Sequence, residues 1–261
     1  MKTKFLLFAL LVSSFSFAQF DDKFYQPNKK FTPITEVNYN EFKIPVERDT
    51  IAGLFLKPEG QSKATVLFFQ GAGGNPTSYL ELTEPLVKAG YQVFMIGFRG
   101  YGKSTGTPTH KNIQQDAQKF LDYVLIQPEL RKQKIIVYGV SMGSQAATNL
   151  TKNNQGKIDA LVLDGTISSF TDLAVHFAPA QESLIRQVPF PYSAEEDIKS
   201  ISIPTLFIHS KEDKMVPYTQ AEEVFANAKE PKEFLTYTGD HLNAMKTVSK
   251  EIIAKIDTFI K

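Results

Sequence analysis

Residues 137–148 read "VYGVSMGSQAAT", and this stretch decides how the rest of the chain is interpreted. A β-branched, apolar run leads into small and helix-compatible residues, with Gly139 and Gly143 placed two positions either side of Ser141. In a sharp turn from a strand into a helix the residue at the bend is strained, and flanking glycines relieve the crowding around it. The pattern therefore predicts a strand, a tight turn and a helix, with the Ser141 hydroxyl raised above the end of the strand.

A serine hydroxyl at that position is suited to act as a nucleophile. Backbone N–H groups and the dipole at a helix N-terminus favour developing negative charge. A serine hydroxyl becomes a good nucleophile when a base removes its proton and an acid orients that base. The G-x-S-x-G pattern therefore predicts Ser141 as a nucleophile and requires a histidine and a carboxylate elsewhere in the chain.

The chain has four histidines from which the base can come. His241 lies in "YTGDHLNAM", after the last predicted strand and just before the predicted C-terminal helix. His110, in the polar stretch "GTPTHKN", is predicted to be a solvated loop residue, and His209 a structural residue that ends a strand. His176 is expected to line a pocket or to lie on the surface. We therefore predict His241 as the base.

The acid is expected between the nucleophile and the base in chain order, in a loop at the carboxyl end of a strand. Asp213 in "IHSKEDKMVP" fits both conditions. Glu212 is the neighbouring rival. Asp240 is a weaker candidate, because a residue directly before His241 rarely reaches back to the ring. We predict Asp213.

An acyl transfer also needs donors for the oxyanion of its tetrahedral intermediate. One is predicted to be the backbone N–H of Met142, directly after the nucleophile. The other is expected in the glycine-rich loop "QGAGGN", residues 70–75, and is assigned to Ala72. This loop does not match a phosphate-binding loop, because no lysine followed by serine or threonine comes after it.

The rest of the chain predicts an α/β protein with a mainly parallel sheet and helices on both faces. Residues 38–56 alternate about a charged turn and predict an antiparallel hairpin. Six later strands are predicted at residues 64–70, 91–98, 134–140, 158–164, 205–209 and 233–237, and helices at 78–88, 111–127, 142–153, 219–228 and 243–260. Residues 166–200 contain no clear strand but several prolines and aromatic residues, and predict a small cap insertion.

The first 18 residues predict a signal peptide. Two lysines precede an apolar run, and Ser16 and Ala18 supply small residues for cleavage before Gln19. Serines interrupt the run, which disfavours a membrane anchor. We therefore expect a single domain over residues 19–261, exported to a periplasm or out of the cell.

The amino-acid composition excludes several kinds of site and partner. The chain has no cysteine, which excludes disulfides, thiolate metal sites and a cysteine nucleophile. Without residues 1–18 it holds 27 basic and 28 acidic residues, a net charge of −1, so nucleic acid is not an expected partner. No metal or organic cofactor is implied, and the oligomeric state is left open.

Four segments together resemble the α/β-hydrolase superfamily, and within it the Bem46-like serine hydrolases. They are "FRGYGKSTGTPT" (98–109), "YGVSMGSQAA" (138–147), "IHSKEDKMVP" (208–217) and "KEPKEFLTYTGDH" (229–241). The resemblance implies an α/β-hydrolase fold, the same nucleophile, acid, base and oxyanion residues, and a structural role near the site for Arg99 and Tyr101. Gln70 and Asp240 depart from the family pattern, which has histidine and glycine at these positions.

The leading hypothesis is an exported serine hydrolase that cleaves a carboxylic ester or related acyl bond through an acyl-enzyme. A small acyl compound or a short peptide is the expected partner. The aromatic residues of the predicted cap favour an apolar acyl group. Alternatives are a serine peptidase of aminopeptidase type and a noncatalytic binding protein on the same scaffold.

Overall fold

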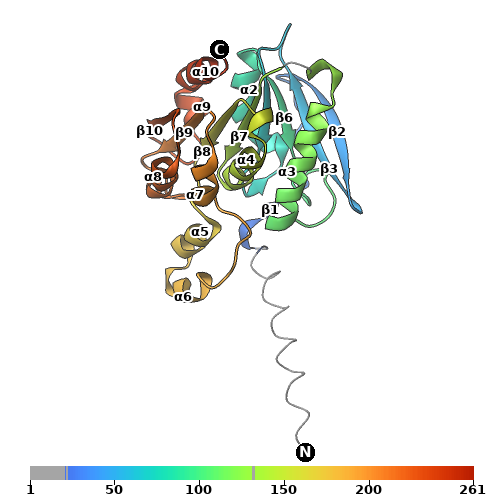
Figure 1. Cartoon of the computed structure of the whole chain (residues 1–261). Coiled ribbons are helices and arrows are strands. Elements are labelled where there is room, and N and C mark those ends of the chain that lie inside the picture. The colour runs from blue at the N-terminus through green and yellow to red at the C-terminus, as the bar shows by residue number, and fades with distance from the viewer. Residues whose placement is uncertain (1–20, 22, 131–132) are drawn as a thin grey trace, which may run out of the picture.

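The computed structural model describes residues 21, 23–130 and 133–261, so the predicted signal peptide lies outside the described residues. An eight-stranded sheet forms its centre, in the order β10-β9-β8-β7-β4-β6-β3-β2 (Figure 1). The pair β2–β3 and the pair β3–β6 are antiparallel, and the remaining pairs are parallel. The strands are β2 (Asn38–Val46), β3 (Asp49–Lys57), β4 (Thr65–Phe69), β6 (Gln92–Ile96), β7 (Ile135–Val140), β8 (Ala160–Asp164), β9 (Thr205–Ser210) and β10 (Lys232–Tyr237).

Burial of the strands follows their place in the sheet. Every residue of β4, β6, β7, β8 and β9 is buried, which explains why these strands read as continuous rather than alternating apolar runs. The edge strand β2 alternates buried and exposed residues from Phe42 to Val46. The predicted hairpin and the mainly parallel sheet are confirmed.

Helices cover both faces of the sheet, as predicted, and each face has its own apolar cluster. On one face lie α3 (His110–Leu125), α4 (Met142–Asn153) and α8 (Tyr218–Asn227), and on the other α2 (Leu80–Lys88) and α10 (Ser249–Phe259). Short 3₁₀ turns lie at η1 (Pro76–Tyr79), η2 (Pro128–Leu130) and η3 (Gln155–Lys157).

The C-terminal helix departs from the prediction of one helix over residues 243–260. It is divided into α9 (Ala244–Thr247) and α10, with Val248 between them at φ −130°. The Thr247 hydroxyl bonds back to the carbonyls of Asn243 and Ala244, and such bonds compete with regular helix geometry.

Residues 166–200, which we call the cap segment, contain short helices and no described strand. These are α5 (Phe170–Phe177), η4 (Pro179–Gln181), α6 (Glu182–Ile185), α7 (Ala194–Asp197) and η5 (Ile198–Ser200). In Figure 1, α5 and α6 extend away from the sheet, whereas α7 lies close to α8. Phe170 is buried, while Phe177 and Leu184 are 59% and 56% exposed.

A second, two-stranded sheet was not predicted. Its strands are β1 (Gln26–Pro27) and β5 (Gly73–Gly74), which pair in parallel. Two residues are too few to show a strand periodicity in the sequence. Among the helices of the described residues, none is long and apolar enough to cross a membrane.

Candidate active site

Ser141 lies in the turn between β7 and α4, at the carboxyl edge of the sheet. Its backbone has φ 50° and ψ −121°, a conformation that non-glycine residues rarely adopt. The turn is held because the Ser141 N–H donates to the Asp164 carbonyl at 2.8 Å and the Ser144 N–H to the Ser141 carbonyl at 2.9 Å. A strained residue that its surroundings hold in place is typical of a functional site.

The close approach of neighbouring elements explains why both positions that flank Ser141 are glycines. A Cβ on Gly139 would lie 2.5 Å from the Ala147 Cβ, and one on Gly143 would lie 2.2 Å from the Phe69 carbonyl oxygen. Both positions therefore require glycine because β7, α4 and β4 approach so closely. The sequence analysis predicted crowding against the residue at the bend, whereas the contacts that exclude a side chain are with α4 and with the end of β4.

His241 and Asp213 come together from the loops after β10 and β9. The Nδ1 atom of His241 lies 2.5 Å from Asp213 Oδ2. Since a carboxylate accepts, Nδ1–H donates to it, and Nε2 is the ring nitrogen that remains for other contacts. Gly165 leaves room for the ring, because a Cβ there would lie 2.7 Å from the His241 Cε1.

The Asp213 carboxylate is held from several sides. Its side chain is 1% exposed, and Oδ1 accepts the N–H groups of Met215 and Val216, each at 2.9 Å. Burial by itself raises the pKa of Asp213, but the hydrogen bond from His241 and these two N–H groups outweigh it, so that the pKa is lowered. Asp213 is therefore an ionised acceptor that fixes the orientation of the imidazole.

His209 supports the same loop. Its Nε2–H donates to the Val216 carbonyl at 3.0 Å, and the side chain is fully buried, in keeping with the structural role predicted for it. Burial lowers the pKa of His209, so the ring is neutral near pH 7. The rival acid, Glu212, instead accepts the Gly239 N–H at 2.9 Å, which ties the acid loop to the loop that carries His241.

The glycine-rich loop after β4 passes close to the nucleophile. A Cβ on Gly71 would lie 3.4 Å from the Ser141 Cβ. Ala72 and Met142, the two predicted oxyanion residues, both line the same cavity as Ser141. The Tyr79 hydroxyl donates to the Gly73 carbonyl at 2.8 Å, and the Tyr101 hydroxyl donates to the Ala72 carbonyl, so the loop is held firmly from behind.

A cavity of about 940 Å³ opens over Ser141 and His241. This volume lies at the upper end of the range for small-molecule sites. Most of the residues that line it are apolar. Beyond the loops near Ser141, these include Leu173, Ala174 and Phe177 of α5, Ala178 directly after it, Ile185 of α6, Met215 and Val216 of the acid loop, and Leu242 next to His241. The arrangement places a hydroxyl and an imidazole in a largely apolar cavity.

Asp164 was missed by the sequence analysis, because it ends an apolar strand and carries no motif. The Tyr138 hydroxyl donates to its Oδ2 at 3.2 Å, and Oδ1 has no hydrogen-bond partner among the described residues. Burial raises the pKa of Asp164 to about 7, although the nearby His241 opposes the shift. Besides the ionised Asp213, the site therefore has a second buried carboxyl group nearby, Asp164, whose pKa lies close to neutral pH.

Three other sequence expectations have different outcomes. The prediction for His110 was wrong: its ring is 3% exposed, at the start of α3, because aromatic residues far away in the sequence cover it.

Arg99 lies outside the cavity lining and binds Asp116 through two hydrogen bonds of 2.8 and 2.9 Å, a structural role as expected. The Gln70 side chain is fully buried, and neither of its polar atoms has a hydrogen-bond partner among the described residues.

One group of carboxylates among the described residues could approach a cation. Atoms of Asp172, Glu195 and Glu223 lie within 4.8 Å of one another. The pKa of Glu195 is raised to about 7, by burial first and then by the two neighbouring carboxylates. None of the three lines the cavity over Ser141, so this group is separate from the site.

Comparisons with known proteins agree with this architecture. Residues 64–188 match the model of the α/β hydrolase fold family. The chain is 28% identical to YfhR of Salmonella typhi over 93% of this chain and 88% of that protein. It is 36% identical to Bem46 of Schizosaccharomyces pombe over 66% of this chain and 59% of that protein. The predicted resemblance is thereby confirmed.

Solved structures confirm the fold. An esterase of Pyrococcus furiosus, Pf2001, superposes with a TM-score of 0.72 at 20% identity, covering 90% of this chain and 98% of that one. A cold-adapted esterase from an Arctic intertidal metagenomic library gives a TM-score of 0.66 at 19% identity, covering 90% and 100%. At this level of identity the likeness establishes the arrangement of strands and helices.

Proposed function

The chain belongs to the α/β-hydrolase family, and from that premise we propose that it is a serine hydrolase that cleaves a carboxylic ester or related acyl bond. One observation carries the proposal. Ser141 and His241 line one cavity, and the His241 ring is oriented by a hydrogen bond of 2.5 Å to the buried carboxylate of Asp213.

In the proposed reaction the Ser141 hydroxyl attacks the carbonyl carbon of the substrate. His241 Nε2 takes the hydroxyl proton and then gives it to the leaving group, while Asp213 keeps the imidazole in this tautomer. The N–H groups of Ala72 and Met142 donate to the oxyanion. Water then attacks the acyl-enzyme with His241 again as base, which releases the acid and restores the Ser141 hydroxyl.

The cavity favours an apolar acyl group. Its lining from α5 and α6 is aliphatic and aromatic, and its volume suits a chain of several carbons. A peptidase of aminopeptidase type needs an anionic group for the ammonium of its substrate. Among the described residues that line the cavity there is no carboxylate, which disfavours this alternative.

The test is hydrolysis of p-nitrophenyl esters of increasing acyl length. We expect turnover that is best with medium-length chains, and a loss of at least about 10³-fold in kcat for Ser141→Ala. Ser200→Ala, at an exposed serine, is the matched control. A fluorophosphonate should label Ser141 and not the variant. If neither turnover nor labelling is found, the noncatalytic binding protein replaces the hydrolase.

Export is the second part of the proposal. It is supported by the lysines, the apolar run and the small residues at Ser16 and Ala18. Mass spectrometry of protein recovered outside the cytoplasm should give an N-terminus at Gln19. Recovery of the chain with Met1 in the cytoplasm alone would contradict it.

A further inference from the structure

The chain before the sheet lies across the candidate site. We call residues 23–31 the N-terminal strap. Lys23, Phe24 and Gln26 line the cavity together with Ala72 and Ser141. The proposed reaction gives these strap residues no role, although they lie directly beside the oxyanion loop.

The backbone of the strap is bonded to the oxyanion loop. The Gln26 N–H donates to the Ala72 carbonyl at 2.9 Å and lies 3.0 Å from the Tyr101 hydroxyl oxygen. Tyr101 donates to the same carbonyl, and the Asn28 N–H donates to the Gly74 carbonyl at 2.9 Å. These bonds fix the carbonyl of Ala72, and so they restrict rotation of the adjoining peptide, whose N–H is the proposed oxyanion donor.

Side chains anchor the first half of the strap. Tyr25 is 6% exposed, and its hydroxyl lies 2.7 Å from His110 Nδ1, while Asp21 lies 3.0 Å from Nε2. Burial lowers the pKa of His110 to about 3, so the ring is neutral. Tyr25 therefore donates to Nδ1, and the ring proton is on Nε2, which lies near the Asp21 carboxylate. Phe24 packs edge-on against Phe170 of the cap segment.

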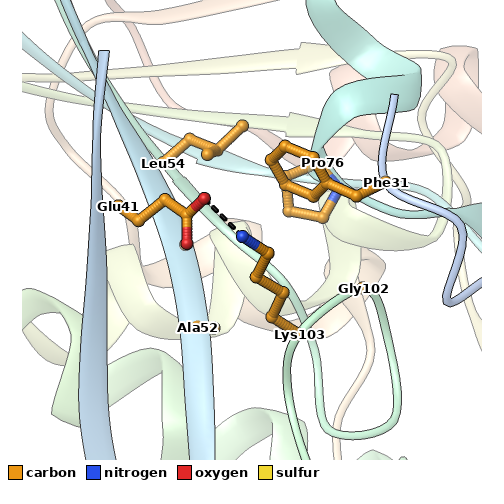
Figure 2. Close-up of a pocket in the computed structure, with 8 residues that line it drawn as sticks. Phe31, Glu41, Ala52, Leu54, Pro76, Gly102 and Lys103 are labelled. Atoms are coloured by element: carbon orange, nitrogen blue, oxygen red, sulfur yellow. Dashed lines mark hydrogen bonds and ion pairs between the residues drawn. The ribbon is translucent and has the colours of Figure 1, made fainter. Parts of the chain in front are cut away.

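The other end of the strap is also held. The Asn75 side-chain amide donates to the carbonyls of Asn28 and Lys30, at 3.2 and 2.8 Å. Figure 2 shows Phe31 beside Lys103, whose ammonium lies 4.6 Å from the ring centre and 2.5 Å from Glu41. The pocket in this figure measures about 10 Å³, room for about one water, so Phe31 is packed closely against its neighbours there.

We propose that the N-terminal strap is a positioning element for the oxyanion loop: it holds Ala72 so that its N–H meets the oxyanion formed at Ser141. This inference rests on the proposed hydrolase function. The strap contributes to the stabilisation of the transition state through the backbone hydrogen bond from Gln26 to Ala72. Its loss should therefore lower kcat more than it raises KM.

A pair of variants at one position tests this. Gln26→Pro removes the N–H that bonds to Ala72, whereas Gln26→Ala keeps it and removes the same side chain. We expect kcat of Gln26→Pro to be at least about tenfold below that of Gln26→Ala for every ester, with KM for the acetyl ester within about threefold. A boronic acid that becomes tetrahedral on Ser141 should bind Gln26→Pro more weakly by the same factor.

Thermal unfolding shows whether each variant is folded. If Gln26→Pro does not fold, Tyr101→Phe removes the other donor to the Ala72 carbonyl and keeps the ring, and kcat should fall about threefold to tenfold with little change in KM. Folded variants with kcat equal to their references would overturn the inference while leaving the hydrolase intact. Absence of turnover in the unsubstituted protein, by contrast, would overturn the proposed function itself.

Discussion

The two sides of the cavity are built in different ways. The floor consists of Ser141 and His241, with Asp213 bonded to His241, at the ends of β7, β10 and β9, and it is fixed by backbone hydrogen bonds and by the buried carboxylate. The cap segment leaves Phe177 and Leu184 more than half exposed. The backbone around the floor therefore has little freedom to change, whereas the cap segment can vary more, and under the proposed function it is the part expected to select the substrate.

The largest effect is expected at the floor, from Asp213→Asn. Asparagine keeps the shape but not the charge, and the imidazole loses the partner that holds its tautomer. We expect kcat to fall about 10⁴-fold, by analogy with serine proteases. Asp240→Asn, next to His241 but exposed, is the control and should stay within about twofold. A larger loss in Asp240→Asn than in Asp213→Asn would show that the wrong carboxylate has been assigned.

Next comes Gly143→Ala, which tests how rigid the floor is. The new Cβ would lie 2.2 Å from the Phe69 carbonyl and 2.5 Å from that of Gln70, so backbone must move. We expect the free energy of unfolding to fall by about 2–5 kcal/mol, measured by urea denaturation. Gly156→Ala, with no atom within 4 Å of its new Cβ, should change it by less than about 0.5 kcal/mol. A Gly143→Ala protein with unchanged stability would mean that the backbone around Ser141 can shift at little cost in free energy.

Asp164→Asn tests the support beneath the floor through pH. The pKa of Asp164 is raised to about 7, so the folded chain keeps a proton that the unfolded chain loses from about pH 4 upward. The free energy of unfolding should therefore fall as pH rises between about 4 and 7. The variant should lose the part of this slope that Asp164 supplies and keep the part from Glu195, whose pKa is also raised to about 7. Relative to the unsubstituted protein it gains up to about 4 kcal/mol at pH 8 compared with pH 4. Parallel pH curves for the two proteins would refute the assignment.

The smallest effect is expected in the cap segment. Phe177 lines the cavity and Leu184 does not, although the two side chains are about equally exposed. We expect Phe177→Ala to raise KM for long-chain esters about threefold to tenfold, because apolar contact with the acyl chain is lost. Leu184→Ala should leave KM unchanged, and both should unfold at nearly the temperature of the parent. Equal KM values for the two variants would remove the cap segment from substrate selection.

Features with a local signal in the sequence could be predicted, whereas contacts between distant parts of the chain could not. The turn at Ser141 and the buried strands were predictable because their signals are local: two glycines at fixed spacing and continuous apolar runs. Asp213 and His241 followed from chain order. The strap has no such local signal, because Tyr25 meets His110 across 85 residues of sequence and His110 lies among polar neighbours. For the same reason the burial of His110 was not foreseen.

The strand order has a consequence for how the protein is made. β7, which leads to Ser141, lies between β4 and β8, so its neighbours are complete once about two thirds of the chain has been synthesised. Asp213 and His241 follow β9 and β10, the last two strands in the sequence, which together form one edge of the sheet. A nascent chain that ends after β8 already holds β7, both of its neighbouring strands and Ser141, and still lacks both acid and base. Under the proposed mechanism, hydrolytic activity becomes possible only when synthesis is nearly finished.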